Sequence, residues 1–531
     1  MNRRSRLGQV IGGLGLSGLL LLNSVVLFGQ DTLGGASILD ADRSGGAVFT
    51  VRKAKPRQVP QAEKRQVAVV IRRPANDKPA AHAGSSTPDR PRPPRPVTPQ
   101  ITPEEKAYQL VEKGDEYFDQ KQYQKAIDSY QASLKIVPNN GEAFYGMGDA
   151  YDALNQEDQA LAAYEKAVKF KPNIGMAHYN MGLIYYGRQR FEDAQKAWTQ
   201  AVIYRPSDPV LFNYLGLVDL ELKKNEEAAT AFTNAVKFKG DYAEGYYNLA
   251  SAYIRLNRVP EAIENYKQAI HFKPDYAEAY FDMGVAYYGQ KKYSDAISAY
   301  TAASKLMPGN ADVLKELGDS YKQIEQWDNV ARVYLQATQI EPKDADALSE
   351  LGYAYGQNKR WPEAVAALRK AAELNPNDAE DLSNLGWALS KSKSHAEAVD
   401  VLKQAVKLNP NFAPAQFNLG FSLAVLQRYQ EAAVAFGEAV RLAPKSAKAH
   451  NNLGFVYGNL DQWDKAIAEG KRAVEIDPQY SEAYMNLGIA YVINGKKKEA
   501  VELQKKLKTF DPVNAERLQV VIDHPPAKKK K

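Results

Sequence analysis

The sequence predicts an all-α solenoid of about twelve helix pairs, preceded by a disordered arm. Two observations support this prediction. Prolines recur every 34 residues from Pro138 to Pro512, except for one interval of 68 in which Gly240 takes the place of the missing proline. Within each period, two stripes of apolar residues follow the i, i+3, i+4, i+7 spacing of an amphipathic helix. A period this regular indicates stacked repeats and not several globular domains.

Residues 1–30 have the pattern of an export signal. Arg3, Arg4 and Arg6 precede the segment 7–30, which has no charged side chain. This pattern is typical of a signal peptide, and the segment is also long enough to span a bilayer as an uncleaved signal anchor. Both alternatives predict an exported protein, either periplasmic or anchored in the membrane through residues 7–30. Because the chain has no cysteine and no N-x-Ser/Thr acceptor, we expect a bacterial cell envelope.

The segment 31–103 is rich in Pro, Arg, Ala and Val, and eleven of the 28 prolines lie before residue 104. This composition cannot bury enough apolar surface to fold, so we expect a disordered linker. Residues 91–96 alternate proline and arginine like a ligand for an aromatic groove, although a plain spacer also explains them. Two β-prone runs, 48–51 and 67–71, are candidates for adding a strand to a partner's sheet.

Twelve repeats occupy residues 104–514, and the first period begins at Ala107 when the recurrent proline is numbered position 32. Position 8 is glycine in every repeat but one, which has Ala250, and position 20 is alanine in every repeat but one, which has Val330. Small residues here predict close packing of the two helices, while large residues at positions 4, 7, 11 and 24 fill the space between helices. Since proline lacks an N–H, we expect position 32 to end the second helix.

This pattern resembles the tetratricopeptide repeat family over about three quarters of the chain. Residues 274–280, Pro-Asp-Tyr-Ala-Glu-Ala-Tyr, read like a junction between two successive repeats of that family. The resemblance implies a right-handed α-solenoid whose first helices line a concave groove that holds a peptide or protein partner. Position 11 is Asp219, Leu389 and Leu423 where the family usually has tyrosine, and Gly470 and Gln504 replace the bulky residue at position 24. In those repeats we expect packing that is looser, or compensated by other residues.

Residues 515–531 follow the last repeat. Ala515, Leu518, Val521 and Ile522 have the spacing of one apolar helix face, which predicts a short capping helix. Four lysines, 528–531, then form a basic tail that we interpret as a solvated end.

The sequence predicts no enzyme. The six histidines do not pair with another histidine or an acid at metal-ligand spacing within one helix, and the glycines follow the repeat period instead of forming a phosphate-binding loop. The lack of cysteine excludes a thiol nucleophile and Cys-ligated zinc. We therefore predict no catalytic residue, no cofactor and no metal site.

The last four repeats carry the candidate binding site. Their position 6 is asparagine and their position 9, one helical turn later, is apolar; in the family, both positions face the concave surface. Carboxamides can exchange hydrogen bonds with any peptide backbone, while aromatic faces accept side chains. The alternative is that these asparagines only tie neighbouring helices together. The candidate peptide-binding residues are Asn384, Asn418, Asn452 and Asn486, with Trp387, Phe421, Phe455 and Ile489.

The formal net charge of +6 divides unevenly along the chain. Residues 1–103 hold 16 basic and six acidic residues, a net of +10, and the four terminal lysines add +4. The segment 104–527 therefore has a net charge of −8, so we expect no binding of nucleic acid. The function we predict is a noncatalytic protein-protein interaction scaffold or adaptor of the cell envelope. The alternative is an envelope spacer or self-assembly element whose basic arm binds anionic envelope polymers.

Overall fold

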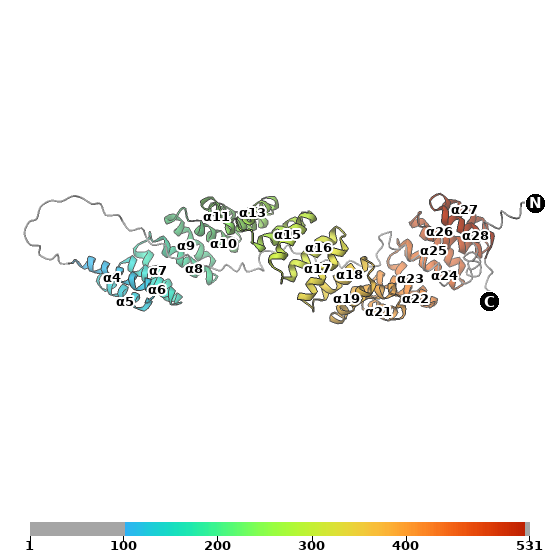
Figure 1. Cartoon of the computed structure of the whole chain (residues 1–531), viewed down its shortest axis with the longest axis horizontal. Coiled ribbons are helices and arrows are strands. Elements are labelled where there is room, and N and C mark those ends of the chain that lie inside the picture. The colour runs from blue at the N-terminus through green and yellow to red at the C-terminus, as the bar shows by residue number, and fades with distance from the viewer. Residues whose placement is uncertain (1–100, 526–531) are drawn as a thin grey trace, which may run out of the picture. The chain divides into compact units, whose positions relative to one another are not determined.

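The computed structural model describes residues 101–525, which form twenty-five α-helices and no strand (Figure 1). The predicted signal or anchor 1–30, the predicted linker 31–103 up to residue 100, and the lysine tail lie outside the described residues. Within 101–525, no helix is both long enough and apolar enough to cross a membrane.

The described helices divide into two compact units. We call residues 101–308 the N-terminal unit and residues 309–525 the C-terminal unit. In both units the even-numbered helices up to α26 are the first helices of the repeats, and the odd-numbered helices are the second helices. The prediction of an all-α fold built from twelve helix pairs is confirmed.

The N-terminal unit contains six helix pairs. They are α4 (Pro103–Asp119), α5 (Tyr123–Ile136), α6 (Gly141–Ala153), α7 (Glu157–Phe170), α8 (Gly175–Gly187), α9 (Phe191–Tyr204), α10 (Pro209–Glu221), α11 (Asn225–Phe238), α12 (Ala243–Arg255), α13 (Val259–Phe272), α14 (Ala277–Gly289) and α15 (Tyr293–Leu306).

The C-terminal unit contains six helix pairs and one further helix. They are α16 (Ala311–Gln323), α17 (Trp327–Ile340), α18 (Ala345–Gln357), α19 (Trp361–Leu374), α20 (Ala379–Lys391), α21 (His395–Leu408), α22 (Ala413–Val425), α23 (Tyr429–Leu442), α24 (Ala447–Asn459), α25 (Trp463–Ile476), α26 (Ser481–Ile493), α27 (Lys497–Lys508) and α28 (Pro512–Asp523).

Each first helix ends in a left-handed residue at position 15. At the end of α4, for example, Lys121 has φ 58°, its N–H donates to Phe118 O, and the N–H of Gln122 donates to Tyr117 O. These two bonds form a Schellman motif, which satisfies the last carbonyls of the helix. Only the twelfth repeat has glycine at this position, Gly495 with φ 78°, so eleven repeats hold a side chain in a conformation that L-residues disfavour.

The glycine at position 8 allows the two helices of a repeat to approach closely. A Cβ atom on Gly182 would lie 2.2 Å from Nε1 of Trp198, and a Cβ on Gly148 would lie 2.4 Å from the ring of Tyr164. Trp198 is held in place because its Nε1 donates to the carbonyl oxygen of Tyr179 at 3.1 Å. The large residue at position 24 therefore occupies the space that the missing side chain leaves.

Neighbouring elements compensate where position 24 has no large side chain. Leu487 approaches Gly470, with its Cβ 3.1 Å from where a Cβ on that glycine would lie. In the twelfth repeat, a Cβ on Gly488 would lie 2.6 Å from Leu518 of α28. Leu518 is fully buried, together with Ala515 and Ile522 of the same helix. The sequence predicted that packing in these repeats is either looser or compensated by other residues, and the structure shows compensation.

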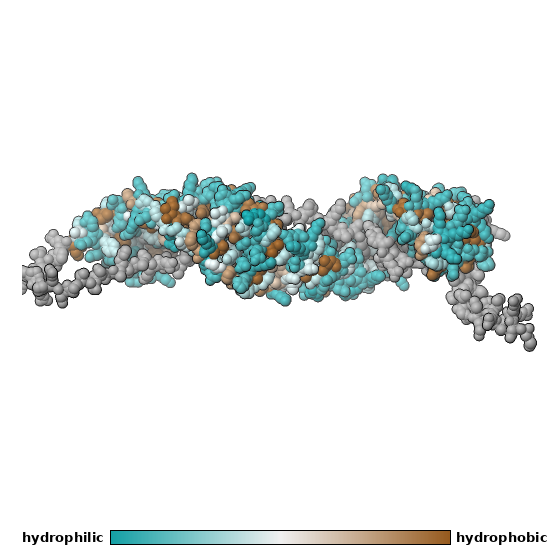
Figure 2. All heavy atoms as spheres, turned by 90° about the horizontal axis from the view of Figure 1, so that it is seen from above, coloured by the Kyte–Doolittle hydropathy of each residue, from teal (hydrophilic) through white to brown (hydrophobic). Residues whose placement is uncertain are grey.

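The surface is polar with separate apolar patches, as one face of the molecule shows in Figure 2. Some of the exposed large apolar residues lie at the ends of second helices, and the aromatic ones among them in the N-terminal unit stack on rings of first helices. Phe170 stacks on Phe144 with ring centroids 5.7 Å apart, and Phe272 stacks on Tyr246 at 5.6 Å. Phe170 and Phe272 are 42% and 39% exposed, so each covers one side of its neighbour's ring and leaves its own outer side in water.

Candidate peptide-binding site

The eight predicted site residues lie on four first helices of the C-terminal unit, α20, α22, α24 and α26. On each helix the asparagine and the apolar residue are three positions apart, so they share one side of the helix. Successive first helices contact one another, which places the four pairs side by side. We call this surface the Asn–aromatic face; it consists of Asn384, Asn418, Asn452, Asn486, Trp387, Phe421, Phe455 and Ile489.

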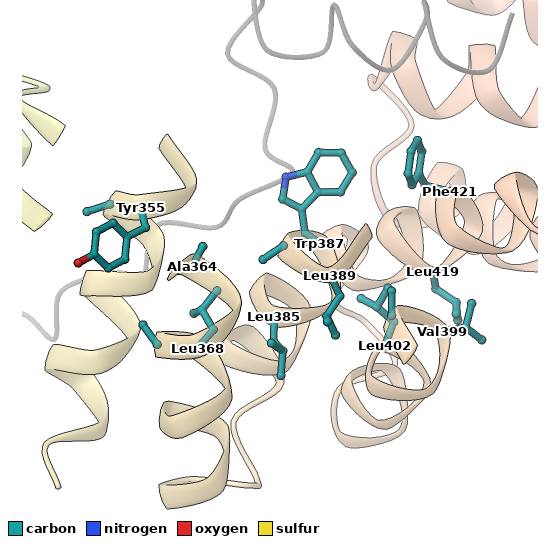
Figure 3. Close-up of a cluster of buried hydrophobic side chains, with 14 of the residues drawn as sticks. Tyr355, Ala364, Leu368, Leu385, Trp387, Leu389, Val399, Leu402, Leu419 and Phe421 are labelled. Atoms are coloured by element: carbon teal, nitrogen blue, oxygen red, sulfur yellow. The ribbon is translucent and has the colours of Figure 1, made fainter. Parts of the chain in front are cut away.

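Two aromatic residues of this face contact each other across neighbouring repeats. The rings of Trp387 and Phe421 meet edge to face, with centroids 5.4 Å apart and an interplanar angle of 68°. Lys391 places its Nζ 4.5 Å from the centroid of Trp387. Figure 3 shows both rings pointing away from Leu385 and Leu389, which pack toward the second helices. Edge-to-face contact and a cation over the indole both fix the orientation of Trp387.

Two of the asparagines tie neighbouring first helices together. Asn418 Nδ2 donates to Ser383 Oγ at 3.3 Å, and Asn486 Nδ2 donates to Asn451 Oδ1 at 2.9 Å. Each acceptor is at position 5 of the preceding repeat. The alternative role, in which the asparagines tie neighbouring helices together, is therefore observed for the side chains of Asn418 and Asn486. Contact of the asparagines with a peptide stays a prediction.

The remaining residues of the face differ in burial. Asn384 and Asn452 are 3% and 6% exposed, whereas Phe455 and Ile489 are half-buried. The apolar edge of the face is thus most enclosed at Trp387 and more open toward α26.

Serine contacts along the face were not predicted. The hydroxyl of Ser349 donates to the carboxylate of Asp381, which joins α18 to α20. The hydroxyls of Ser390 and Ser422 are hydrogen-bonded at 2.5 Å, which joins α20 to α22. The sequence gives no signal for such bonds between helices, because a serine at these positions is equally compatible with exposure to solvent. These bonds fix the spacing of the first helices on which the candidate residues lie.

The face becomes acidic toward the first two repeats of the C-terminal unit. Lys322 Nζ lies 2.6 and 2.7 Å from the two carboxylate oxygens of Glu350, and this ion pair is largely buried. Lys315 lies within 3.2 Å of three carboxylates. At positions 2, 6 and 9 of α16 and α18, five carboxylates outnumber these two lysines. We call this group the acidic end: Asp312, Glu316, Asp319, Asp346 and Glu350.

A different arrangement of position 9 occurs in three repeats. In the first two repeats of the N-terminal unit position 9 is aspartate, and the tyrosine at position 24 donates to it: Tyr130 to Asp115 and Tyr164 to Asp149, both at 2.7 Å. The first repeat of the C-terminal unit has the same bond, from Tyr334 to Asp319 at 2.5 Å. Asn180 Nδ2 also donates to Asp149, at 3.0 Å. Burial raises the pKa of Asp115. The sequence signal for these contacts is an Asp and a Tyr fifteen residues apart in one repeat.

Asp219 takes the place of a tyrosine at position 11 and is 4% exposed. Gln195 Nε2 donates to its Oδ1 at 2.5 Å, and Lys224 donates to Gln195 Oε1 at 2.8 Å. Burial raises the pKa of Asp219 to about 6, against the opposing effect of the Gln195 bond. Three hydrogen-bonded side chains, Lys224, Gln195 and Asp219, thus take the place of a tyrosine ring in this repeat.

His450, which makes a polar contact through each of its ring nitrogens, has a packing role. His450 Nδ1 lies 2.6 Å from Glu469 Oε2, and its Nε2 lies 3.2 Å from the carbonyl oxygen of Pro444. Glu469 precedes Gly470, so the imidazole and carboxylate lie beside the position where a large side chain is missing. Within residues 101–525, no group of three or more histidine or acidic side chains is placed to hold a metal ion.

Models of repeat families match the helix pairs of both units. Tetratricopeptide repeat models match residues 114–155, 148–189 and 459–495, residues 179–244, and residues 481–514. A model described as the cilia and flagella-associated protein 70 C-terminal domain matches residues 240–454. The chain belongs to the tetratricopeptide repeat family. The resemblance noted in the sequence is therefore confirmed. No curated protein matches this tetratricopeptide repeat protein.

Solved structures with similar helical repeats include three with the following scores. MamA is 25% identical with a TM-score of 0.30, and the match covers 30% of this chain and 95% of MamA. YrrB, described as a TPR protein with an unusual peptide-binding site, is 23% identical with a TM-score of 0.33, covering 35% of this chain and 96% of YrrB. The APC/C hetero-tetramer Cut9-Hcn1 is 13% identical with a TM-score of 0.37, covering 80% and 99%. Because these scores are low, family membership rests on the repeat models and the helix pairs.

Proposed function

We propose that this tetratricopeptide repeat protein is a noncatalytic scaffold or adaptor that binds extended segments of protein partners on its Asn–aromatic face. The family and the fold support protein-protein interaction as the general role. The observation that favours this face is the edge-to-face pair of Trp387 and Phe421, whose rings point away from Leu385 and Leu389 and share their helices with Asn384 and Asn418.

The chemistry of the face suits a peptide in extended conformation. Side chains of such a peptide alternate in direction, so every second one can lie against the aromatic edge. The carboxamide groups lie on the other edge, where they can accept from or donate to backbone groups without regard to sequence. The acidic end lies on first helices of the same unit and favours basic residues at one end of the bound segment. The partner class we propose is an apolar segment flanked by basic residues.

Replacing the four asparagines tests this assignment. The chain offers a matched control, because four asparagines at position 33, Asn139, Asn173, Asn377 and Asn411, are exposed in turns. Peptides selected from a random library on the full chain should lose at least tenfold in affinity for the variant with all four face asparagines changed to Ala, about 1.4 kcal/mol. The position 33 variant should keep full affinity.

Stability must be separated from binding in this test, since Asn418 and Asn486 also tie helices together. Thermal unfolding of each single variant measures the first effect. If affinity falls only for Asn418→Ala and Asn486→Ala, and in proportion to their unfolding temperature, the asparagines are structural ties and the proposed binding face is wrong.

We further propose that the protein acts outside the cytoplasm, in a bacterial cell envelope. The support is the pattern of Arg3, Arg4 and Arg6 before the uncharged segment 7–30. A reporter fused after residue 531 should be accessible to protease in intact spheroplasts. Protection of the reporter in intact spheroplasts, with cleavage after lysis, would contradict export.

The uneven charge of the chain favours a second candidate function. A basic arm with a net charge of +10 could grip anionic envelope polymers while the repeats act as a spacer. Deleting residues 36–103 should then abolish envelope association at low salt, where electrostatic attraction is least screened. Association that persists in the deletion variant would exclude this role of the arm.

A further inference from the structure

Positions that are buried between repeats are exposed in the first repeat. Positions 3 and 10 of the first helix are buried in repeats two to twelve. In the first repeat, which no helix pair precedes among the described residues, they are Gln109 and Glu116, and both are exposed. Gly245 shows what covers position 3 elsewhere, because a Cβ on it would lie 3.0 Å from Val236, at position 28 of the preceding repeat. Positions 3 and 28 therefore meet between repeats, and position 10 lies two turns along the same side.

The matching change occurs at position 28 of the last repeat. In repeats one to eleven this position is uncharged and is buried or half-buried. In the twelfth repeat it is Lys508, which is exposed although α28 follows it. The two terminal repeats thus carry charges of opposite sign, Glu116 and Lys508, where internal repeats pack on a neighbour. Terminal repeats need polar residues for solubility, but charges of one sign at both ends would meet that need equally well.

Position 10 of the first repeat belongs to a larger acidic surface on α4. Six exposed carboxylates lie within about 120° of the circumference of this helix, at roughly 100° per residue. The ring of Tyr108, which is 57% exposed, lies among them. Burial raises the pKa of Asp115, and the negative charges of Asp119 and Glu112 raise it further. We call this surface the acidic α4 face; it consists of Glu104, Glu105, Glu112, Asp115, Glu116 and Asp119.

Helix α27 of the C-terminal unit carries the opposite charge. It has five exposed lysines and two glutamates, a net charge of +3, which is the largest among the second helices. Between described residues, no ion pair includes these lysines, nor Glu112 or Glu116 of α4. Four of the lysines lie on one side of the helix, within about 100° of its circumference. We call this side the basic α27 face; it consists of Lys497, Lys498, Lys505 and Lys508.

The two faces also agree in length. The acidic α4 face extends from Glu104 to Asp119, about 22 Å at roughly 1.5 Å per residue. The basic α27 face extends from Lys497 to Lys508, about 17 Å. When two such helices lie side by side, every lysine of the one can therefore reach a carboxylate of the other.

We propose that the protein assembles head to tail, with the acidic α4 face of one copy on the basic α27 face of the next. Carboxylates of α4 pair with lysines of α27, and Tyr108 packs on the apolar stems of these lysines. Because the two faces differ, the contact is heterologous, so each pair of copies keeps one free face of each kind and further copies can add. This assembly goes beyond the proposed peptide binding and uses none of the residues of the Asn–aromatic face.

Sedimentation equilibrium of the full chain tests the assembly. At low salt the average mass should rise with protein concentration beyond that of a dimer. At about 0.5 M NaCl it should fall, because salt screens exposed charges. A chain that stays monomeric at low salt over the whole concentration range would overturn the proposal, and the terminal charges would then serve solubility alone.

Charge reversal identifies the two faces. The α4 variant is Glu112→Lys, Glu116→Lys, and the α27 variant is Lys497→Glu, Lys508→Glu. Each should weaken self-association at least tenfold, because like charges then face one another. All four side chains are exposed, so the variants should keep the circular dichroism spectrum of the unaltered chain. Association of either variant at the level of the unaltered chain would overturn the proposal.

A second helix inside the repeat array supplies the matched control. Lys292 immediately precedes α15 and Lys305 lies in its last turn, as Lys508 lies in the last turn of α27. Both are exposed, and between described residues neither forms an ion pair. The variant Lys292→Glu, Lys305→Glu should associate like the unaltered chain. If it loses association as the α27 variant does, the effect comes from total charge and the assigned faces are wrong.

Mixing the variants tests the head-to-tail geometry. Equal amounts of the α4 variant and the α27 variant should associate again, because the unaltered lysines of the first meet the unaltered carboxylates of the second. Variants that stay apart in the mixture would contradict the proposal. If the α27 variant keeps self-association but loses binding to phosphatidylglycerol vesicles, its lysines face an anionic membrane and the proposal is wrong. Both variants should bind library-selected peptides with unaltered affinity, so assembly and the proposed function can fail separately.

Discussion

The N-terminal and C-terminal units place their aromatic residues at different positions of the same repeat. In the N-terminal unit, position 24 is aromatic in all six repeats and position 9 in none. In the C-terminal unit, position 24 is aromatic only in Tyr334 and Phe436, while position 9 is aromatic in Tyr353, Trp387, Phe421 and Phe455. Rings at position 24 fill the space beside a glycine within the repeat, whereas rings at position 9 lie on the first-helix face.

The difference separates aromatic residues that fill the space within a repeat from aromatic residues on the face for which we propose a role in recognition. In the N-terminal unit the rings are fully enclosed, as for Trp198, Tyr164 and Phe232. In the C-terminal unit two repeats also use rings here, Tyr334 beside Gly318 and Phe436 beside Gly420. The other four use leucine, either at position 24 or from neighbouring elements. One repeat framework thus accommodates both uses, and substitutions in the two units should have different effects.

The largest effect is expected at the end of the C-terminal unit, where α28 supplies the side chain that repeat twelve lacks. Leu518→Ala should lower the free energy of unfolding of this unit by about 3 kcal/mol, because it opens a cavity beside Gly488. The control Val520→Ala lies on the exposed side of the same helix, at 55% exposure, and should cost less than about 0.5 kcal/mol. Urea unfolding followed by circular dichroism measures both, and equal losses would show that Leu518 does not fill the space.

A slightly smaller effect is expected from adding a methyl group at position 8. Gly182→Ala should destabilise the N-terminal unit by about 2 kcal/mol, because the new Cβ would meet the fixed indole of Trp198. In the C-terminal unit, the Cβ of Gly454→Ala would meet no ring; its nearest neighbour would be Ala466 O at 3.2 Å, so the change should cost less than about 1 kcal/mol. The same unfolding measurement compares them. If Gly454→Ala were the more damaging of the two, the proposed difference in packing between the units would be wrong.

The buried Asp219 predicts a pH dependence specific to the N-terminal unit. Because its folded pKa of about 6 is above the unfolded value of 3.8, the folded chain binds more protons between these values, and its stability falls as pH rises through them. Asp219→Asn should remove this dependence and raise the free energy of unfolding at pH 7 by about 1–2 kcal/mol. Unfolding curves at pH 4 and pH 7 measure it. A variant with the same pH dependence as the unaltered chain would show that Asp219 is not the titrating group.

The smallest effect concerns the turns, and it should be equal in both units. Gln189→Gly in the N-terminal unit and Glu325→Gly in the C-terminal unit should each stabilise by about 0.5–1 kcal/mol, because their φ values of 58° and 56° suit glycine. The reverse change, Gly495→Ala, should destabilise by about 1 kcal/mol. Melting temperatures of the three variants test this, and a stabilisation in only one unit would contradict it.

The sequence predicted the parts of the fold that depend on regular spacing. Prolines at position 32 ended the second helices as expected, since α7 and α13 end two residues before Pro172 and Pro274. The turn at position 15 was not predicted. Its left-handed residues include lysine, glutamine and glutamate, which carry no sequence signal for positive φ. Schellman bonding and packing of the next helix impose that conformation.

The candidate site was predictable only in part, for a related reason. The register of Asn418 and Phe421 follows from helix geometry, so their common side could be inferred from spacing. The donation from Asn418 to Ser383, and the contact of Ser390 with Ser422, depend on how adjacent first helices approach each other. That approach is set by packing across two repeats, which no single repeat sequence encodes.

Hydrogen-deuterium exchange of the full chain, with and without a peptide selected from a library, tests most directly whether recognition belongs to the C-terminal unit. The expected result is added protection of α20, α22, α24 and α26, with no change in the first helices of the N-terminal unit. Protection confined to α6, α8, α10 or α12, with α20 and α22 unchanged, would contradict the assignment of the Asn–aromatic face as the binding surface.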